Sequence, residues 1–164
     1  MNFPPLVMDS SCLINLHNGG VLKSVFKLPF EFITTDFIYH EIRLDWGKLV
    51  CLGLRINHFS GKQVNEIYLI TQQAGKGLTA QDVSVFYLAK ENQWMLLCDD
   101  GALRKYATAK HVMVHGSIWV LDQLIIGNLV TRIEAASCLD IMRVKGAHFS
   151  DNLFNQTIIR WTNK

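Results

Sequence analysis

Short apolar runs alternate with segments of helical periodicity through the first two thirds of this 164-residue chain, and this alternation constrains the fold most. The clearest helical patterns span residues 61–75 and 78–93. The strands that we expect span residues 5–8, 30–35, 54–60, 94–98 and 111–116. Parallel neighbouring strands need a crossover, usually a helix, so the pattern predicts a central parallel sheet flanked by helices in three layers.

After residue 116 the pattern is helical, and it predicts helices over residues 117–128, 131–146 and 150–164. Neither a linker nor a repeat separates this part from the strands, and 164 residues is the size of one ordinary domain. We therefore expect a single α/β domain over residues 1–164. Its core spans about residues 5–116, and a helical C-terminal extension spans about residues 117–164.

Composition excludes several classes of protein. With 49% hydrophobic and 18% charged residues the chain is not disordered as a whole, and a net charge of +2 excludes a strongly basic, histone-like binder. Four dispersed cysteines without a C-x-x-C pair disfavour a zinc site and are typical of reduced thiols. The sequence shows no signal-peptide pattern and no apolar run that favours a membrane span, so we expect a cytoplasmic protein.

Two aspartates, Asp99 and Asp100, stand side by side in LLCDDGALRKYA, directly after an expected buried strand. One of them can cap the helix that follows, but a cap needs only one aspartate. Neighbouring carboxylates repel each other, and burying either without a partner costs several kcal/mol. The second aspartate therefore needs a different explanation.

Three further carboxylates stand close to expected strand ends or helix starts. Asp9 follows the first strand, Glu41 lies in the helix after the second strand, and Asp82 opens the helix that precedes the fourth strand. Each also has an ordinary structural interpretation. Asp9 can cap a helix, Glu41 can be a solvated helical residue, and Asp82 can complete a capping box with Thr79.

In a doubly wound sheet, helix starts gather at the carboxyl edge of the sheet, where such folds bind ligands. Carboxylates that meet there repel one another unless a cation lies among them. Oxygen-only ligands suit Mg²⁺ or Mn²⁺, which usually contact a substrate phosphate as well. The expected metal ligands are Asp9, Glu41, Asp82, Asp99 and Asp100.

Five motifs in order resemble those of the PIN-domain nucleases: VMDSSCLINL, ITTDFIYHEI, GLTAQDVSVFYLAKE, LLCDDGALRKYA and VHGSIWVLDQLIIGNLV. The resemblance covers almost the whole chain and is strongest to VapC-like ribonuclease toxins and related prokaryotic PIN proteins. It implies a compact α/β fold, an acidic site for one or two Mg²⁺ or Mn²⁺ ions, and cleavage of RNA.

The resemblance also implies roles for individual residues. Those that match the family's catalytic acids are Asp9, Glu41, Asp82 and Asp100. Within the acidic pair Asp100 is the better match and Asp99 the second, while Cys98 stands where threonine is common. Candidates for contact with RNA are Ser10 or Ser11, which match a small hydroxyl residue of the family, and the basic Arg104 and Lys105 of the next helix.

These observations together predict a Mg²⁺- or Mn²⁺-dependent endoribonuclease that cleaves phosphodiester bonds with metal-activated water. The resemblance adds the role of toxin in a type II toxin–antitoxin pair, with an antitoxin protein and a second copy of the chain as partners. Two alternatives stay open: a PIN-fold nuclease that is not a toxin, and a non-catalytic regulatory or binding domain. An Asp-x-Asp phosphatase is disfavoured because DSSCL has no second acid two residues after Asp9.

Overall fold

The structure, a computed structural model, describes residues 4–163. At its centre lies a five-stranded sheet in which every pair of neighbours is parallel. The strands are β1 (Leu6–Met8), β2 (Phe32–Thr35), β3 (Arg55–Asn57), β4 (Met95–Leu97) and β5 (Val114–His115). Their order is β3-β2-β1-β4-β5, so the direction of winding reverses between β1 and β4. Open α/β sheets bind ligands at such a switch point.

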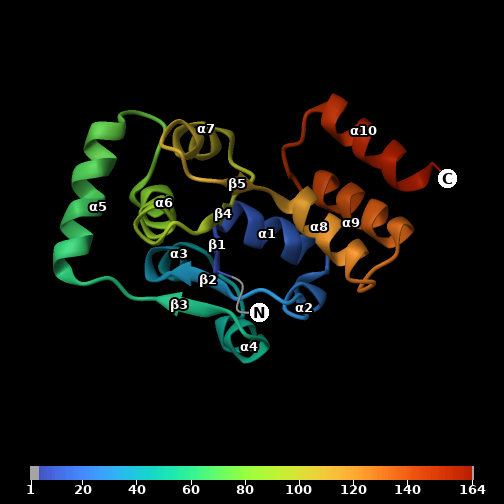
Figure 1. Cartoon of the computed structure of the whole chain (residues 1–164), viewed down its shortest axis with the longest axis horizontal. Helices are drawn as coiled ribbons and strands as arrows, with labels where there is room; N and C mark the ends of the chain where they lie inside the picture. The colour runs from blue at the N-terminus through green and yellow to red at the C-terminus, as the bar shows by residue number, and fades with distance from the viewer. Residues whose placement is uncertain (1–3, 164) are drawn as a thin grey trace.

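Helices cover both faces of the sheet (Figure 1). Those within the strand-containing part are α1 (Ser10–Asn18), α2 (Leu22–Val25), α3 (Asp36–Glu41), α4 (Trp46–Leu52), α5 (Gly61–Ala74), α6 (Ala80–Asn92) and α7 (Gly101–Ala109). After β5 come α8 (Ser117–Ile126), α9 (Arg132–Val144) and α10 (Asp151–Thr162). Helices α3, α6 and α7 lie on one side of the sheet and α1, α2 and α8 on the other, as predicted for a three-layer α/β fold.

The core lies around β1, β4 and α6. All three residues of β1 are buried, which is typical of a parallel strand covered on both faces. Helix α6 is buried over seven successive residues, from Val83 to Ala89, because it packs against the sheet on one side and α5 on the other. Such a helix shows little amphipathic contrast, so its capping signals mark its start better than its periodicity does.

The predicted capping box of α6 is confirmed. Thr79 Oγ1 accepts a hydrogen bond from Asp82 N at 3.2 Å, and Asp82 Oδ2 accepts one from Thr79 N at 2.7 Å. Ser150 caps α10 through Leu153 N at 3.2 Å, also as predicted. These caps satisfy backbone N–H groups that have no partner inside the helix.

One element was not predicted. The helical pattern that begins at Asp36 ends at Glu41, since Ile42 has extended dihedrals (φ −111°, ψ 146°), and a separate helix α4 follows. Asp45 starts α4 by accepting a hydrogen bond from Lys48 N at 3.0 Å. The expected strand at 111–116 is also shorter than predicted, because His111 turns the chain with φ 62°.

The C-terminal helices share the hydrophobic core of the sheet. Leu121 and Leu124 of α8 and Leu139 and Met142 of α9 are fully buried in the same cluster as β1 and β4. Helix α10 is tied to α8 by Asp122, which accepts hydrogen bonds from Arg160 and Trp161. Among residues 4–163, none of the helices is long and apolar enough to cross a membrane.

Candidate functional site

Asp9 lies at the carboxyl end of β1, beside the switch point, and is only 1% exposed. It caps α1: its Oδ2 accepts hydrogen bonds from the backbone N and the Oγ of Ser11, at 3.2 and 2.6 Å. Its Oδ1 is buried and has no hydrogen-bond partner within residues 4–163. A cap and a ligand role are therefore compatible, because they use different oxygens.

Burial raises the pKa of Asp9 from 3.8 to about 6, against hydrogen bonds from Ser11 that lower it, and the negative charge of Asp82 raises it further. At neutral pH the side chain is mostly ionised despite its burial. An ionised, buried carboxylate with an unpartnered oxygen is costly, and a cation at that oxygen would offset the cost.

The negative charge of Asp82 acts on both Asp9 and Glu41. Partial burial raises the pKa of Glu41, the negative charge of Asp82 raises it further, and a hydrogen bond from Ser10 opposes both. Asp82 uses its Oδ2 in the capping box, while its Oδ1 accepts no hydrogen bond from the part of the chain that the structure describes. We call Asp9, Glu41 and Asp82 the acidic cluster.

Both carboxylate oxygens of Asp99 accept hydrogen bonds from neighbouring helices. Its Oδ1 accepts a hydrogen bond from Ser117 N at 2.8 Å, and its Oδ2 accepts from Asn15 Nδ2 at 2.7 Å and from the Ser117 hydroxyl. Asp99 thereby joins α1, the end of β4 and the start of α8. Its N–H also donates to Ser11 Oγ at 3.0 Å, which connects it to the serine that holds Asp9.

Asp100 is exposed and caps α7, with its Oδ1 accepting a hydrogen bond from Leu103 N at 2.8 Å. The cap that the sequence predicts for one member of the pair therefore falls to Asp100, while Asp99 holds the buried network. A ligand role for either aspartate stays a prediction.

Within residues 4–163, no group of three His, Cys, Asp or Glu side chains is arranged around one point as metal ligands. The chemistry of the acidic cluster nevertheless suits a divalent cation. It combines the unpartnered, buried Oδ1 of Asp9 with two neighbouring carboxylates, and no Lys or Arg of the described chain forms an ion pair with any of the three. Hard cations such as Mg²⁺ prefer such oxygen donors.

The other predicted contacts lie around these acids. The Ser10 and Ser11 hydroxyls bind Glu41 and Asp9, so in this conformation they orient carboxylates. Arg104 is half-buried, and its Nη1 donates to the carbonyl of Cys98 at 2.7 Å, at the end of β4. Lys105 is exposed on α7.

Three residues around the acidic pair were missed by the sequence reasoning: Asn15, Ser117 and Gly116. A Cβ on Gly116 would lie 2.4 Å from Asp99 Oδ1, so only glycine leaves room for that carboxylate. The sequence could have indicated Gly116 and Ser117 as part of the site, because they follow the last expected strand, at the same sheet edge as the acids. Asn15 lies inside α1 and carries no comparable signal.

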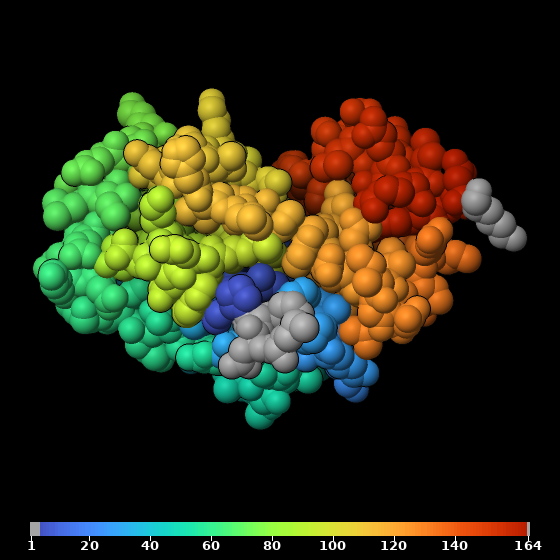
Figure 2. All heavy atoms as spheres, in the orientation of Figure 1, coloured from blue at the N-terminus to red at the C-terminus, as the bar shows by residue number. Residues whose placement is uncertain are grey.

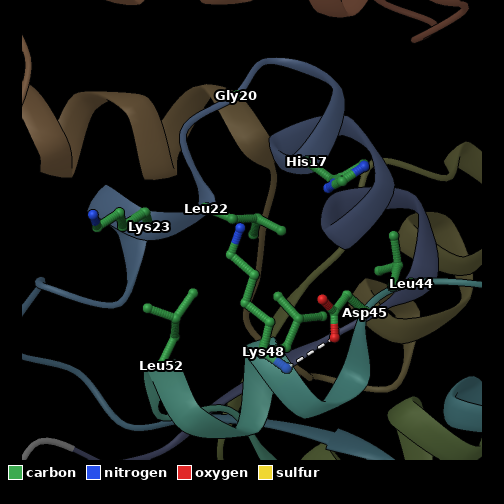
Figure 3. A pocket seen from close by; sticks show the side chains of 9 residues that line it. His17, Gly20, Leu22, Lys23, Leu44, Asp45, Lys48 and Leu52 are labelled. Atoms are coloured by element: carbon green, nitrogen blue, oxygen red, sulfur yellow. Dashed lines mark hydrogen bonds between the residues drawn. The ribbon is translucent and has the colours of Figure 1, made fainter.

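A separate cavity of about 290 Å³ lies between the end of α1, α2 and α4 (Figure 3). Its basic lining residues are His17, Lys23 and Lys48. Asp45 also lines it, but this carboxylate caps α4, as the dashed line in Figure 3 shows. None of the predicted acids lines this cavity.

The chain matches the family described as DUF3368, a PIN domain, over residues 5–163. The chain belongs to this PIN-domain family. The resemblance to PIN-domain proteins that the five motifs indicated is thus confirmed. PIN domains are typically nucleases and commonly use divalent metals.

Two solved structures share the PIN-like fold. A PilT N-terminus domain protein from the archaeon Sulfolobus solfataricus has 16% identity and a TM-score of 0.51, covering 73% of this chain and 92% of its own. The protein PAE2754 from Pyrobaculum aerophilum has 15% identity and a TM-score of 0.52, covering 73% of this chain and 88% of its own. At such identities the likeness supports the fold alone. No curated protein matches the sequence.

Proposed function

We propose that this PIN-domain protein is a Mg²⁺- or Mn²⁺-dependent endoribonuclease that hydrolyses phosphodiester bonds of RNA at the acidic cluster. Membership of a family whose members are typically nucleases supports the reaction class. The observation that carries the proposal is Asp9 Oδ1, a buried and unpartnered carboxylate oxygen at the switch point of the sheet, under the influence of Asp82.

Asp9, Glu41 and Asp82 would hold the ion, with Asp100 at the next strand end as a further donor. When bound, Mg²⁺ or Mn²⁺ lowers the pKa of a water molecule and offsets negative charge on phosphate oxygens. Ser11 fixes Asp9 through its Oδ2 and so keeps the orientation of Oδ1 constant.

Glu41 is the proton acceptor in this proposal. It is the most exposed member of the acidic cluster, so a water molecule at the ion can reach it from solvent. Arg104 and Lys105, on the helix after the acidic pair, contribute positive charge for the RNA backbone.

The test is cleavage of a labelled single-stranded RNA by the purified chain with Mg²⁺ or Mn²⁺. We expect excess EDTA to abolish cleavage, and Asp9→Asn or Asp82→Asn to slow it about a hundredfold or more, as loss of a charge-stabilising group does in other active sites.

Asp36→Asn is the matched control. Asp36 follows β2 and also has a buried Oδ1 without a hydrogen-bond partner within residues 4–163, but its Oδ2 contacts His58 and Phe59 N, which lie outside the acidic cluster. This variant should cleave at the wild-type rate. Undiminished cleavage by Asp9→Asn, or in the presence of EDTA, would refute the proposal.

The finer proposal, that the chain is the toxin of a type II pair with an antitoxin protein as partner, rests on the resemblance to VapC-like toxins. Expression in a bacterial host should then arrest growth, and Asp9→Asn should restore it. Equal growth arrest by the wild type and Asp9→Asn would show that toxicity does not depend on the acidic cluster, and would contradict this role.

A further inference from the structure

A second cavity, of about 320 Å³, lies between α7, the start of α8 and the loop before α10. Figure 1 shows α10 standing apart from α7, and the space-filling view in Figure 2 shows the surface dipping between them. The residues that define its chemistry are Asp99, Arg104, His115, Trp119, His148 and Phe149. The volume is at the lower end of the range for small-molecule sites, about 300–1,000 Å³.

One wall of the cavity is aromatic. The imidazole of His115 stacks on the indole of Trp119, with ring centroids 4.7 Å apart and planes at 11°. Phe149 and Leu153 add apolar surface. Flat rings of this kind are the surfaces on which proteins stack unpaired nucleobases.

The cavity also offers a cationic side chain, that of Arg104. Arg104 forms no ion pair with any carboxylate of residues 4–163, and only its Nη1 is committed, to the Cys98 carbonyl. Asp99 is the only acid in the lining, and both of its oxygens accept hydrogen bonds from Asn15 and Ser117. Helix α8 begins at this wall, where the Ser117 N–H donates to Asp99.

A short path connects the cavity to the acidic cluster. Arg104 binds the carbonyl of Cys98, and the thiol of Cys98 lies 3.5 Å from Asp9 Oδ2. Gly116 keeps the space beside Asp99 and Arg104 free, because a Cβ there would lie 3.2 Å from Arg104 Nη1 and still closer to Asp99. Asp99 lines the cavity and donates its N–H to Ser11, which binds Asp9, so the cavity and the acidic cluster lie at the same edge of the sheet.

We propose that this cavity, the base pocket, binds one unpaired nucleotide of the RNA beside the bond that is cut. The base stacks on the His115–Trp119 rings, and its phosphate contacts Arg104 and His148. A base held in a duplex is paired and stacked on its neighbours, so the pocket selects single-stranded over double-stranded RNA. The identity of the ligand as RNA rests on the proposed function.

The test measures binding without cleavage. In the Asp9→Asn background, a short fluorescent RNA is titrated by anisotropy, once as a single strand and once annealed to its complement. We expect tighter binding of the single strand. Adding His115→Ala or Arg104→Gln should weaken single-strand binding about tenfold, the size of effect that loss of a stacking or phosphate contact produces.

His148→Ala is a further base-pocket variant, chosen because it should stay folded. His148 is exposed, so its loss should weaken binding with little effect on stability. His17→Ala is the matched control, because it removes an exposed histidine from the other cavity and should leave binding unchanged. In the active protein the base-pocket variants should raise KM for RNA and leave kcat within about twofold.

The outcomes separate the two proposals. Single-strand binding that depends on the base pocket, in a protein that cuts no RNA, would support the pocket and refute the nuclease. RNA cleavage whose KM is unchanged by His115→Ala and His148→Ala would support the nuclease and overturn the pocket. Equal affinity for single-stranded and duplex RNA, or no binding of either, would also overturn the pocket.

Discussion

Asp9 and Asp82 each use one carboxylate oxygen in a helix cap and keep the other for a possible ligand. Asp9 Oδ2 caps α1 and Asp82 Oδ2 closes the capping box of α6, while the Oδ1 of each is left without a hydrogen bond from residues 4–163. From the sequence, cap and ligand are competing explanations for each residue. In the structure they are compatible, because a cap uses only one oxygen.

The first prediction concerns the pH dependence of stability at Asp9. Burial raises its pKa from 3.8 to about 6, so folding favours the protonated form. That stabilisation is complete below the unfolded pKa and is lost as pH rises through about 6. Asp9→Asn should therefore stabilise the metal-free protein at about pH 8, by up to about 3 kcal/mol, and change little at about pH 3.

Thermal unfolding in chelator at the two pH values checks this. The same difference in Tm between wild type and Asp9→Asn at both values would show that ionisation of Asp9 does not act on stability. Adding Mg²⁺ at the higher pH should raise the Tm of the wild type only, because a ligand that binds the native state stabilises it.

A second prediction follows from the crowding at Gly116. In Gly116→Ala the new Cβ would meet Asp99 Oδ1 at 2.4 Å and displace a carboxylate that holds Asn15 and Ser117. We expect a loss of about 1–3 kcal/mol in the free energy of unfolding, typical of overpacking. Gly101→Ala is the control, because a Cβ at Gly101 meets nothing within 4 Å. Equal urea midpoints for the two variants would contradict this.

At the scale of elements, the helix starts were the most predictable parts of the chain. Thr79 with Asp82 and Ser150 predict the starts of α6 and α10 because capping is a local interaction within four residues. The break between α3 and α4 was missed because no Gly or Pro marks it, and the contact that accompanies it is made by a side chain. Ile42 is extended, and its carbonyl accepts a hydrogen bond from Trp46 Nε1 at 3.2 Å.

The third prediction separates the two roles of the α6 capping box. Thr79→Ala removes the hydroxyl that accepts from Asp82 N and should cost about 1 kcal/mol of stability while RNA cleavage continues. In Asp82→Asn the amide oxygen can still accept from Thr79 N, so stability should change little while cleavage is lost. Urea unfolding and the cleavage assay together check this. Undiminished cleavage by Asp82→Asn would show that Asp82 does not hold the ion.

At the scale of the molecule, the alternation of strands and helices correctly predicted a parallel three-layer fold, because parallel strands require crossovers. The negative charge of Asp82 raises the pKa of both Asp9 and Glu41 at this edge, while the role of the three acids as metal ligands stays a prediction. The separate tasks of Asp99 and Asp100 could not be predicted. They depend on Asn15 and Ser117, which are 84 and 18 residues from Asp99 in sequence.

The fourth prediction concerns α10, which together with the preceding loop helps to enclose the base pocket. Asp122 on α8 accepts two hydrogen bonds from Arg160, at 2.8 and 2.9 Å, and one from Trp161 Nε1 at 2.8 Å. Asp122→Ala should therefore increase amide hydrogen exchange over residues 148–162 and leave β1 and α6 protected. Asp140→Ala, an exposed aspartate on α9, is the control. A uniform rise in exchange would show that α10 does not open separately.

As a metal-dependent nuclease, the protein would hold a divalent ion between Asp9, Glu41 and Asp82. Titration with Mn²⁺, followed by electron paramagnetic resonance of the free ion, measures this most directly. Wild type and the Asp36→Asn control should bind Mn²⁺ equally, and Mg²⁺ should displace it. Asp9→Asn, Glu41→Gln and Asp82→Asn should each weaken binding by at least about tenfold. Unchanged Mn²⁺ affinity in these three variants would contradict the account.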